Sequence, residues 1–183
     1  MKTIATLILL GISLLGFSQD QFFTRNANIT FFSSTPMEDI KADNYSATAV
    51  LDTKTGAVEF SVLMKSFNFK KALMQEHFNE NYVESSKFPK SVFKGKVENI
   101  GAIDFSKEGK HEVNVSGEIT LHGITKAIST PGTIAVSEGK IISNAVFTLK
   151  PEDFDIEIPA VVRDKIAEEM EVTVNAELEP LRR

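Results

Sequence analysis

The chain has 183 residues, of which 42% are hydrophobic and 25% are charged, a composition typical of a globular protein rather than a disordered one. Its formal net charge of −5 argues against a nucleic-acid-binding protein, because such proteins carry a basic patch or stripe. With no cysteine in the sequence, disulfides, zinc–thiolate sites, iron–sulfur clusters and thiol nucleophiles are excluded. The 14 Phe residues, against 2 Tyr and no Trp, are expected in a core, a cavity or an interface.

Residues 1–18 have the layout of a secretory signal peptide. Lys2 supplies a short positive region, an apolar run covers residues 4–15, and small residues precede a cleavage site after Ser18. The apolar run is shorter than the roughly 20 residues that a membrane-spanning helix needs, so an uncleaved anchor is the less favoured interpretation. We therefore expect no stable membrane span, and a mature chain of residues 19–183 that is periplasmic or secreted.

After the signal peptide, hydrophobic and polar residues alternate with a period of two, which indicates half-buried strands. The alternation is clearest in residues 112–121 and 170–178. Turn signals such as Pro131-Gly132 separate these runs. The sequence predicts eight or nine strands, near residues 22–34, 44–53, 56–67, 91–104, 111–122, 124–136, 140–150 and 169–179.

Two segments break the alternation and are predicted as helices, at residues 70–81 and 159–169. One helical face of the first segment carries Leu73, Met74, His77 and Phe78. The second segment begins with Pro159, which suits the first turn of a helix. Its apolar residues then recur at steps of four.

Many strands with polar outer faces predict one mainly-β domain over residues 19–183, either a sandwich or a closed barrel. An eight-stranded barrel has an interior that its own side chains fill or that holds one small ligand. The composition leaves the filled and the hollow barrel open. The excess of Phe makes a ligand cavity plausible, because the strands that carry these residues already have inward faces.

The histidines offer little catalytic chemistry. His77 lies between Glu76 and Glu80, and a His–Glu pair can reach one metal ion, but a metal site needs three or four ligands, so no metal site is predicted. His122 ends a strand, and it and Lys126 either belong to a tight hairpin or make polar contacts at the mouth of a pocket. The sequence contains no nucleophile elbow, phosphate-binding loop or dinucleotide fingerprint. We therefore predict no catalytic residues and no enzyme.

Three sequence blocks occur in an order that is typical of one known family. The first spans residues 74–93 and contains the predicted helix, an aromatic link and the start of a strand. The second, GEITLHGITK at residues 117–126, is close to a G-x-L-T-L-H-G-V-T-K hairpin, and the third is FTLKPEDFDI at 147–156. Together they resemble the YceI-like family, exported bacterial proteins with a lipocalin-like barrel that bind lipids or polyisoprenoids. The family's usual Gly after Asp-Phe is replaced here by Asp155.

This resemblance implies an eight-stranded antiparallel lipocalin-like barrel with one or two short helices. It also implies that a long-chain lipid, of polyisoprenoid or fatty-acyl type, is sequestered or transported inside the barrel in the periplasm, with no cofactor beyond that lipid. The residues expected to line the cavity are the inward-facing apolar ones: Phe60, Val62, Met64, Leu73, Phe78, Phe93, Val97, Val113, Val115, Ile119, Phe147, Leu149, Phe154, Val172 and Val174. The polar residues expected at its mouth are His77, His122 and Lys126.

Two other interpretations stay open. A ligand-free barrel could act as a stress-related or partner-binding scaffold, and it would have a solid Phe core in place of a Phe-lined void. A lipid-modifying enzyme would need His77 or His122 near a carboxylate inside the cavity. As partners we expect a long-chain lipid and no nucleic acid, and a homodimer that covers an open end of the barrel is an alternative.

Overall fold

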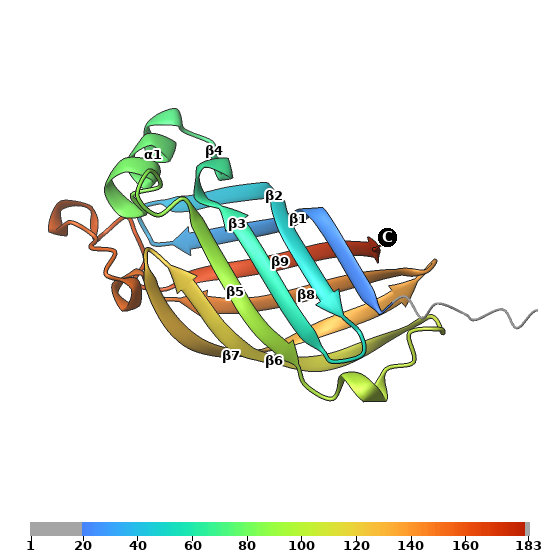
Figure 1. Ribbon diagram of the computed structural model, residues 1–183. Helices are drawn as coiled ribbons and strands as arrows, with labels where there is room; N and C mark the ends of the chain where they lie inside the picture. Colours follow the sequence, from blue (N-terminus) through green and yellow to red (C-terminus); the bar gives the residue numbers. More distant parts are fainter. Residues whose placement is uncertain (1–19, 182–183) are drawn as a thin grey trace, which may run out of the picture.

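The computed structural model describes residues 20–181, so the predicted signal peptide at 1–18 lies outside the described residues. The described chain is mostly antiparallel β-structure (Figure 1). Its strands are β1 (Gln21–Ser34), β2 (Asp39–Asp52), β3 (Ala57–Leu63), β4 (Asn68–Phe69), β5 (Lys90–Val97), β6 (Gly109–Leu121), β7 (Ile124–Ser137), β8 (Lys140–Leu149) and β9 (Met170–Pro180).

The sheet closes on itself, because β1 pairs with β2 as well as with β9. Around the barrel the order of hydrogen-bonded neighbours is β1-β9-β8-β7-β6-β5-β3-β2, and the two-residue strand β4 pairs with β2. Every pairing is antiparallel. The predicted eight-stranded antiparallel barrel is therefore confirmed.

The largest difference in where a strand begins is in β2, which starts at Asp39, five residues before the predicted start of that strand. The pairing of β1 with β2 shifts register between Ala27 and Ile29, and opposite that shift Asn44 is fully buried. Its Nδ2 donates to the Leu63 carbonyl at 2.9 Å, and its Oδ1 accepts from the Ser46 amide at 2.9 Å. A polar residue thus occupies an inward position and interrupts the alternation of apolar and polar residues. For this reason the first part of β2 was not predicted as a strand.

Two other predicted strands end early because the chain turns. The strand predicted to run to residue 67 ends at Leu63, where the 3₁₀ turn η1 (Met64–Ser66) begins. The strand predicted to run to residue 104 ends at Val97, before the 3₁₀ turn η3 (Ile100–Ala102). Asn99 precedes η3 with a left-handed φ of 56°, a conformation that Asn tolerates better than most residues.

The predicted helix at 70–81 is present as α1 (Ala72–His77), which continues into the π-helical segment η2 (Phe78–Tyr82). The predicted helix at 159–169 is wrong. That stretch contains only the 3₁₀ turn η5 (Ala160–Val162), followed by turns. The described residues therefore contain one short α-helix.

The segment after η5 is held by the barrel instead of by helical hydrogen bonds. The amide of Ala167 donates to Oγ of Ser33, a buried residue of β1, at 2.9 Å. Val162 and Ile166, whose spacing suggested a helix, both line the interior cavity described below. Contacts across the rim of the barrel have therefore overridden the local helical pattern.

The two ends of the barrel are built differently (Figure 1). At the first, which we call the closed end, η3 packs beside a filled core of residues that are at most 9% exposed: Phe22, Ile100, Ile103, Val136, Ile141 and Ala176. At the second, which we call the mouth end, α1, η2, η5 and the 3₁₀ turn η4 (Pro151–Phe154) lie over the ends of the strands. The functional site is at the mouth end.

Candidate ligand-binding cavity

The barrel contains a cavity of about 370 Å³, within the roughly 300–1,000 Å³ of small-molecule sites. Its lining is overwhelmingly apolar and extends from Met74 and Phe78 at the mouth end to Val97 and Leu178 near the closed end. The exposed lysines in the lining, Lys150 and Lys165, belong to the mouth end. The cavity therefore opens to solvent at that end.

Half-buried phenylalanines show that the barrel is hollow around this cavity. Phe60, Phe93 and Phe147 line the cavity and pack against the core on one side, yet each keeps part of its surface accessible. In a barrel filled by its own side chains, inward residues on these strands would be fully buried, as Ile141 is at the closed end. The accessible surface of these rings is the wall of the void.

The structure places fourteen of the fifteen predicted apolar residues in the cavity lining. They are Phe60, Val62, Met64, Phe78, Phe93, Val97, Val113, Val115, Ile119, Phe147, Leu149, Phe154, Val172 and Val174.

Leu73 is the exception, because its side chain is 62% exposed and it is not part of the lining. It precedes Phe78 by five residues, which is about 140° around a helix of 3.6 residues per turn. The helical face that turns toward the cavity carries Met74 and Phe78 and leaves Leu73 outside.

Of the three predicted polar residues, only His77 lines the mouth of the cavity. Lys126 is exposed on β7 and is not part of the lining. His122 also lies outside the lining, and its side chain is only 11% exposed. Its Nδ1 is 2.9 Å from the carbonyl oxygen of Phe154, and its Nε2 is 2.8 Å from a carboxylate oxygen of Glu84.

His122 joins three chain segments at the mouth end. Both of its ring nitrogens lie within hydrogen-bonding distance of an oxygen, one from a carbonyl and one from a carboxylate. The ring of Phe88 packs edge-on against the imidazole, with centroids 4.5 Å apart. We call His122, Glu84, Phe88 and Phe154 the mouth clasp. It fastens the link after η2 and the turn η4 to the β6–β7 hairpin.

Two facing glycines shape one wall of the cavity. Gly95 of β5 and Gly117 of β6 are cross-strand partners. A Cβ atom on Gly95 would lie 2.5 Å from Cζ of Phe93, and one on Gly117 would lie 2.4 Å from the Lys94 carbonyl oxygen. The missing side chains let the Phe93 ring lie against the wall, which leaves the centre of the barrel open.

A cluster of four phenylalanines forms the rim beneath α1, and the sequence identified only one of them as a site residue. Phe31, Phe67, Phe69 and Phe78 have ring centroids 5.0 to 5.6 Å apart in the pairs that touch. Phe31 could have been identified from the sequence, because it lies at an inward position of β1. Phe67 and Phe69 follow the turn η1, where no periodicity exists to mark them.

The family model of the YceI-like domain matches residues 18–178 of this chain. The chain belongs to the YceI-like domain family. This confirms the resemblance that the three sequence blocks suggested. A comparison with curated proteins found no match.

Solved structures with the YceI-like fold resemble this chain at low sequence identity. A polyisoprenoid-binding domain from Saccharophagus degradans is 15% identical with a TM-score of 0.77, covering 88% of this chain and 99% of that one. BcnA from Burkholderia cenocepacia is 14% identical with a TM-score of 0.70, covering 83% and 95%. The YCEI protein of Campylobacter jejuni is 17% identical with a TM-score of 0.55, covering 97% of both chains. These similarities establish the fold.

The three blocks that identify this YceI-like chain meet in the mouth clasp. Glu84 and Phe88 come from the first block, His122 from the second and Phe154 from the third. Asp155, at the position where the family usually has Gly, has a left-handed φ of 54°, which explains the preference for Gly there. These blocks therefore fasten the mouth end together through Glu84, Phe88 and His122, which lie outside the cavity lining, whereas Phe154 also lines the cavity.

Proposed function

We propose that this YceI-like protein binds one long-chain apolar lipid, of polyisoprenoid or fatty-acyl type, in the barrel cavity and sequesters or carries it. The observation that supports the proposal best is the hollow half of the barrel, where inward apolar side chains face a void that opens at the mouth end. The alternative, a ligand-free scaffold, predicted a solid Phe core in place of this void. The fold shared with a polyisoprenoid-binding domain adds support.

Chain length is expected to dominate affinity. Each methylene moved from water into the cavity contributes about 0.8 kcal/mol. Ten such groups contribute about 8 kcal/mol, which is comparable with the roughly 4–15 kcal/mol that association costs. Long chains should therefore bind, and short chains should not.

We further propose that the protein acts without catalysis, in the periplasm or after secretion. The export proposal rests on the signal-peptide layout of residues 1–18. A lipid-modifying enzyme would need His77 or His122 beside a carboxylate inside the cavity. His77 lines the mouth, but no carboxylate among residues 20–181 makes a hydrogen bond or ion pair with it. Neither His122 nor its partner Glu84 lines the cavity. Residues 20–181 hold no group of three potential metal ligands. Within the same residues, no helix is long and apolar enough to cross a membrane.

The test is native mass spectrometry of the mature protein, purified without detergent from its native host. We expect an adduct of one lipid per chain, released on denaturation and identified by its own mass. The same spectra test the alternative of a homodimer. A bare mass that persists after incubation with isoprenoids and fatty acids would overturn the lipid-binding proposal.

Two matched variants show whether the adduct occupies the cavity. Ala145→Phe adds a ring to the cavity lining, whereas Ala127→Phe adds the same ring at an exposed position on β7. We expect the first variant to lose the adduct and the second to keep it, with circular dichroism showing that both stay folded. Retention of the adduct by a folded Ala145→Phe variant would place the lipid elsewhere.

A further inference from the structure

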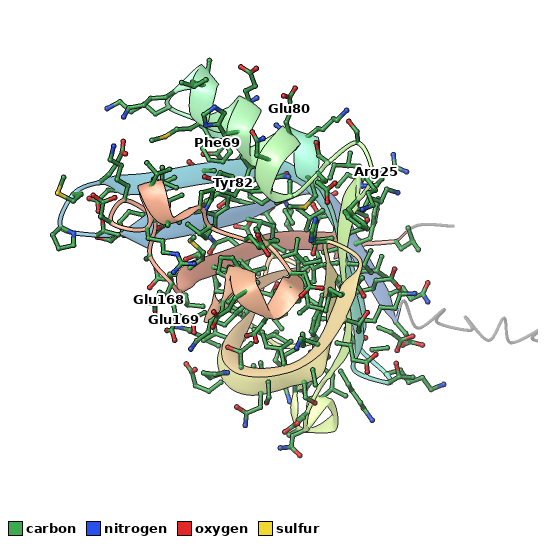
Figure 2. All side chains as sticks on the ribbon, turned by 90° about the vertical axis from the view of Figure 1, so that its left-hand side faces the viewer. Arg25, Phe69, Glu80, Tyr82, Glu168 and Glu169 are labelled. Atoms are coloured by element: carbon green, nitrogen blue, oxygen red, sulfur yellow. The ribbon has the colours of Figure 1, made fainter. Side chains whose placement is uncertain are left out.

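One polar group in the cavity lining lacks a protein partner. Met74, Phe78 and Tyr82 follow one another at steps of four along α1 and η2, and all three line the cavity. Tyr82 ends this stripe, and no residue among 20–181 makes a hydrogen bond with its hydroxyl. Figure 2 looks onto the mouth end, where Tyr82 lies beneath the helical segment near Phe69. A hydroxyl is therefore available at the point where a ligand would enter.

The surroundings of this hydroxyl favour a ligand that accepts a hydrogen bond. Tyr82 is partly buried in the apolar lining, and its hydroxyl is not among the fully buried atoms that lack a partner, so it is open to the cavity. A ligand oxygen there would form a hydrogen bond that the ligand itself shields from water. Burial raises the pKa of Tyr82, so the group stays protonated and can donate. The only other tyrosine, Tyr45, is 62% exposed and does not line the cavity.

We infer that Tyr82 is a specificity-determining residue that donates a hydrogen bond to an oxygen on the polar end of the bound lipid. The lipid then lies with its apolar chain toward the closed end and its head beneath η2. The shared chemistry of the ligand class is a long apolar chain whose head carries an accepting oxygen, whether in an ester, a carboxylate or a phosphate. This inference rests on the proposed lipid binding.

The test compares two ligands that have equal numbers of heavy atoms. Methyl palmitate has ester oxygens that accept hydrogen bonds but no donor, and nonadecane has no polar atom. Affinities for the full mature chain are measured by displacement of a fluorescent dansyl fatty acid, for the wild type, Tyr82→Phe and the matched control Tyr45→Phe. Both substitutions remove only a hydroxyl, so the fold is kept.

We expect Tyr82→Phe to weaken methyl palmitate binding about three- to ten-fold, the effect of one lost hydrogen bond. Nonadecane binding should not change, and Tyr45→Phe should change neither ligand. Palmitic acid and geranylgeranyl phosphate, tested in the same way, then distinguish a carboxylate head from a phosphate head by which affinity depends more strongly on Tyr82.

Two results would overturn the inference, and they can be told apart. If Tyr82→Phe leaves methyl palmitate binding unchanged, or weakens both ligands equally, the assignment of the head group fails. Lipid binding itself still stands in that case, provided that Ala145→Phe abolishes the binding of both ligands. If no lipid binds to the wild type, the inference and the proposed function fail together.

Discussion

The closed end and the mouth end are built from the same strands, yet only one of them is filled. Along β8, Ile141 at the closed end is fully buried, whereas Phe147 and Leu149 toward the mouth keep accessible surface. Next to the closed end, η3 and the residue after it supply Ile100 and Ile103 to the core. At the mouth end the short helical segments lie over the rim, and the void remains. In this barrel the closed end is filled partly by η3 and the residue after it, whereas at the mouth end the void remains and the glycines of β5 and β6 keep its wall thin.

The two ends also differ in whether their polar groups have hydrogen-bond partners. At the closed end the β2–β3 turn is capped, because Asp52 accepts hydrogen bonds from the amides of Lys54 and Thr55. At the mouth end the buried Oδ1 of Asn79 has no partner among the described residues, and the partly buried Tyr82, in the same segment, turns a hydroxyl toward the cavity that makes no hydrogen bond with residues 20–181. Buried polar atoms without partners are rare in native proteins. Their position in η2 associates the mouth end with function and the closed end with stability.

The largest effect on stability is expected when an isoleucine is replaced by alanine at the closed end, compared with the same replacement in the cavity lining. Ile141 is fully buried outside the cavity lining, and Ile128 lines the cavity. We expect Ile141→Ala to lower the free energy of unfolding by about 3 kcal/mol, because it leaves a new void in a packed core. Ile128→Ala should cost only about 1 kcal/mol in the lipid-free protein, because its side chain already borders a void.

Equilibrium urea unfolding of both lipid-free variants measures this difference. Equal losses would mean that the barrel is filled equally at its two ends. With lipid bound, Ile128→Ala should cause a larger loss in the free energy of unfolding. The lipid then contacts the Ile128 side chain in the wild type, and the variant lacks these contacts.

The second-largest effect on stability is expected at the mouth clasp. We expect His122→Ala to lower the free energy of unfolding by about 2 kcal/mol, because it removes two hydrogen bonds and the contact with the Phe88 ring. The matched control is His111→Ala on β6, which removes the same ring at a position where no residue among 20–181 makes a hydrogen bond or ring contact with it. Hydrogen exchange should accelerate in the link after η2 and in η4, and stay slow at the closed end. Uniform acceleration over the barrel would show that the clasp stabilises the whole fold and not one end.

Regular strands are the part of this molecule that the sequence predicts well. From Val113 onward in β6, and throughout β9, each second residue is apolar or Gly, so the inward faces that include Val115, Val172 and Val174 were identified directly. Some lining residues that were missed, such as Phe31 and Ile128, lie in regular strands. Others lie where periodicity ends. Phe67 and Phe69 follow a turn, and Tyr82 lies in a π-helical segment.

Contacts between distant segments explain the remaining differences. His122 was expected at the cavity mouth because it ends a strand, but its partner Glu84 is 38 positions away in the sequence. The predicted helix at 159–169 fails for a similar reason, because Ser33 holds its last part from 134 positions away. A local pattern cannot specify such pairings, and they determine which polar residues reach the cavity.

The smallest effect is expected at the β2–β3 turn of the closed end. The hydrogen bond from the Thr55 amide to Asp52 is the main reason that the pKa of this carboxyl is lowered from 3.8. A lowered folded-state pKa means that the ionised carboxylate stabilises the fold above the unfolded-state pKa, and that this contribution is lost as the pH falls through the folded-state value. Asp52→Asn should therefore lower the melting temperature slightly near neutral pH. The difference from the wild type should shrink below about pH 4, near the unfolded-state pKa.

Thermal unfolding at a series of pH values from neutral to acidic measures this change. A difference that stays constant as the pH falls would show that the ionised carboxylate is not the source of the stability. Lipid retention at neutral pH should be the same in Asp52→Asn as in the wild type, because the turn lies outside the cavity lining. A loss of lipid in this variant would mean that the closed end also controls the cavity, and the division between the two ends would have to be abandoned.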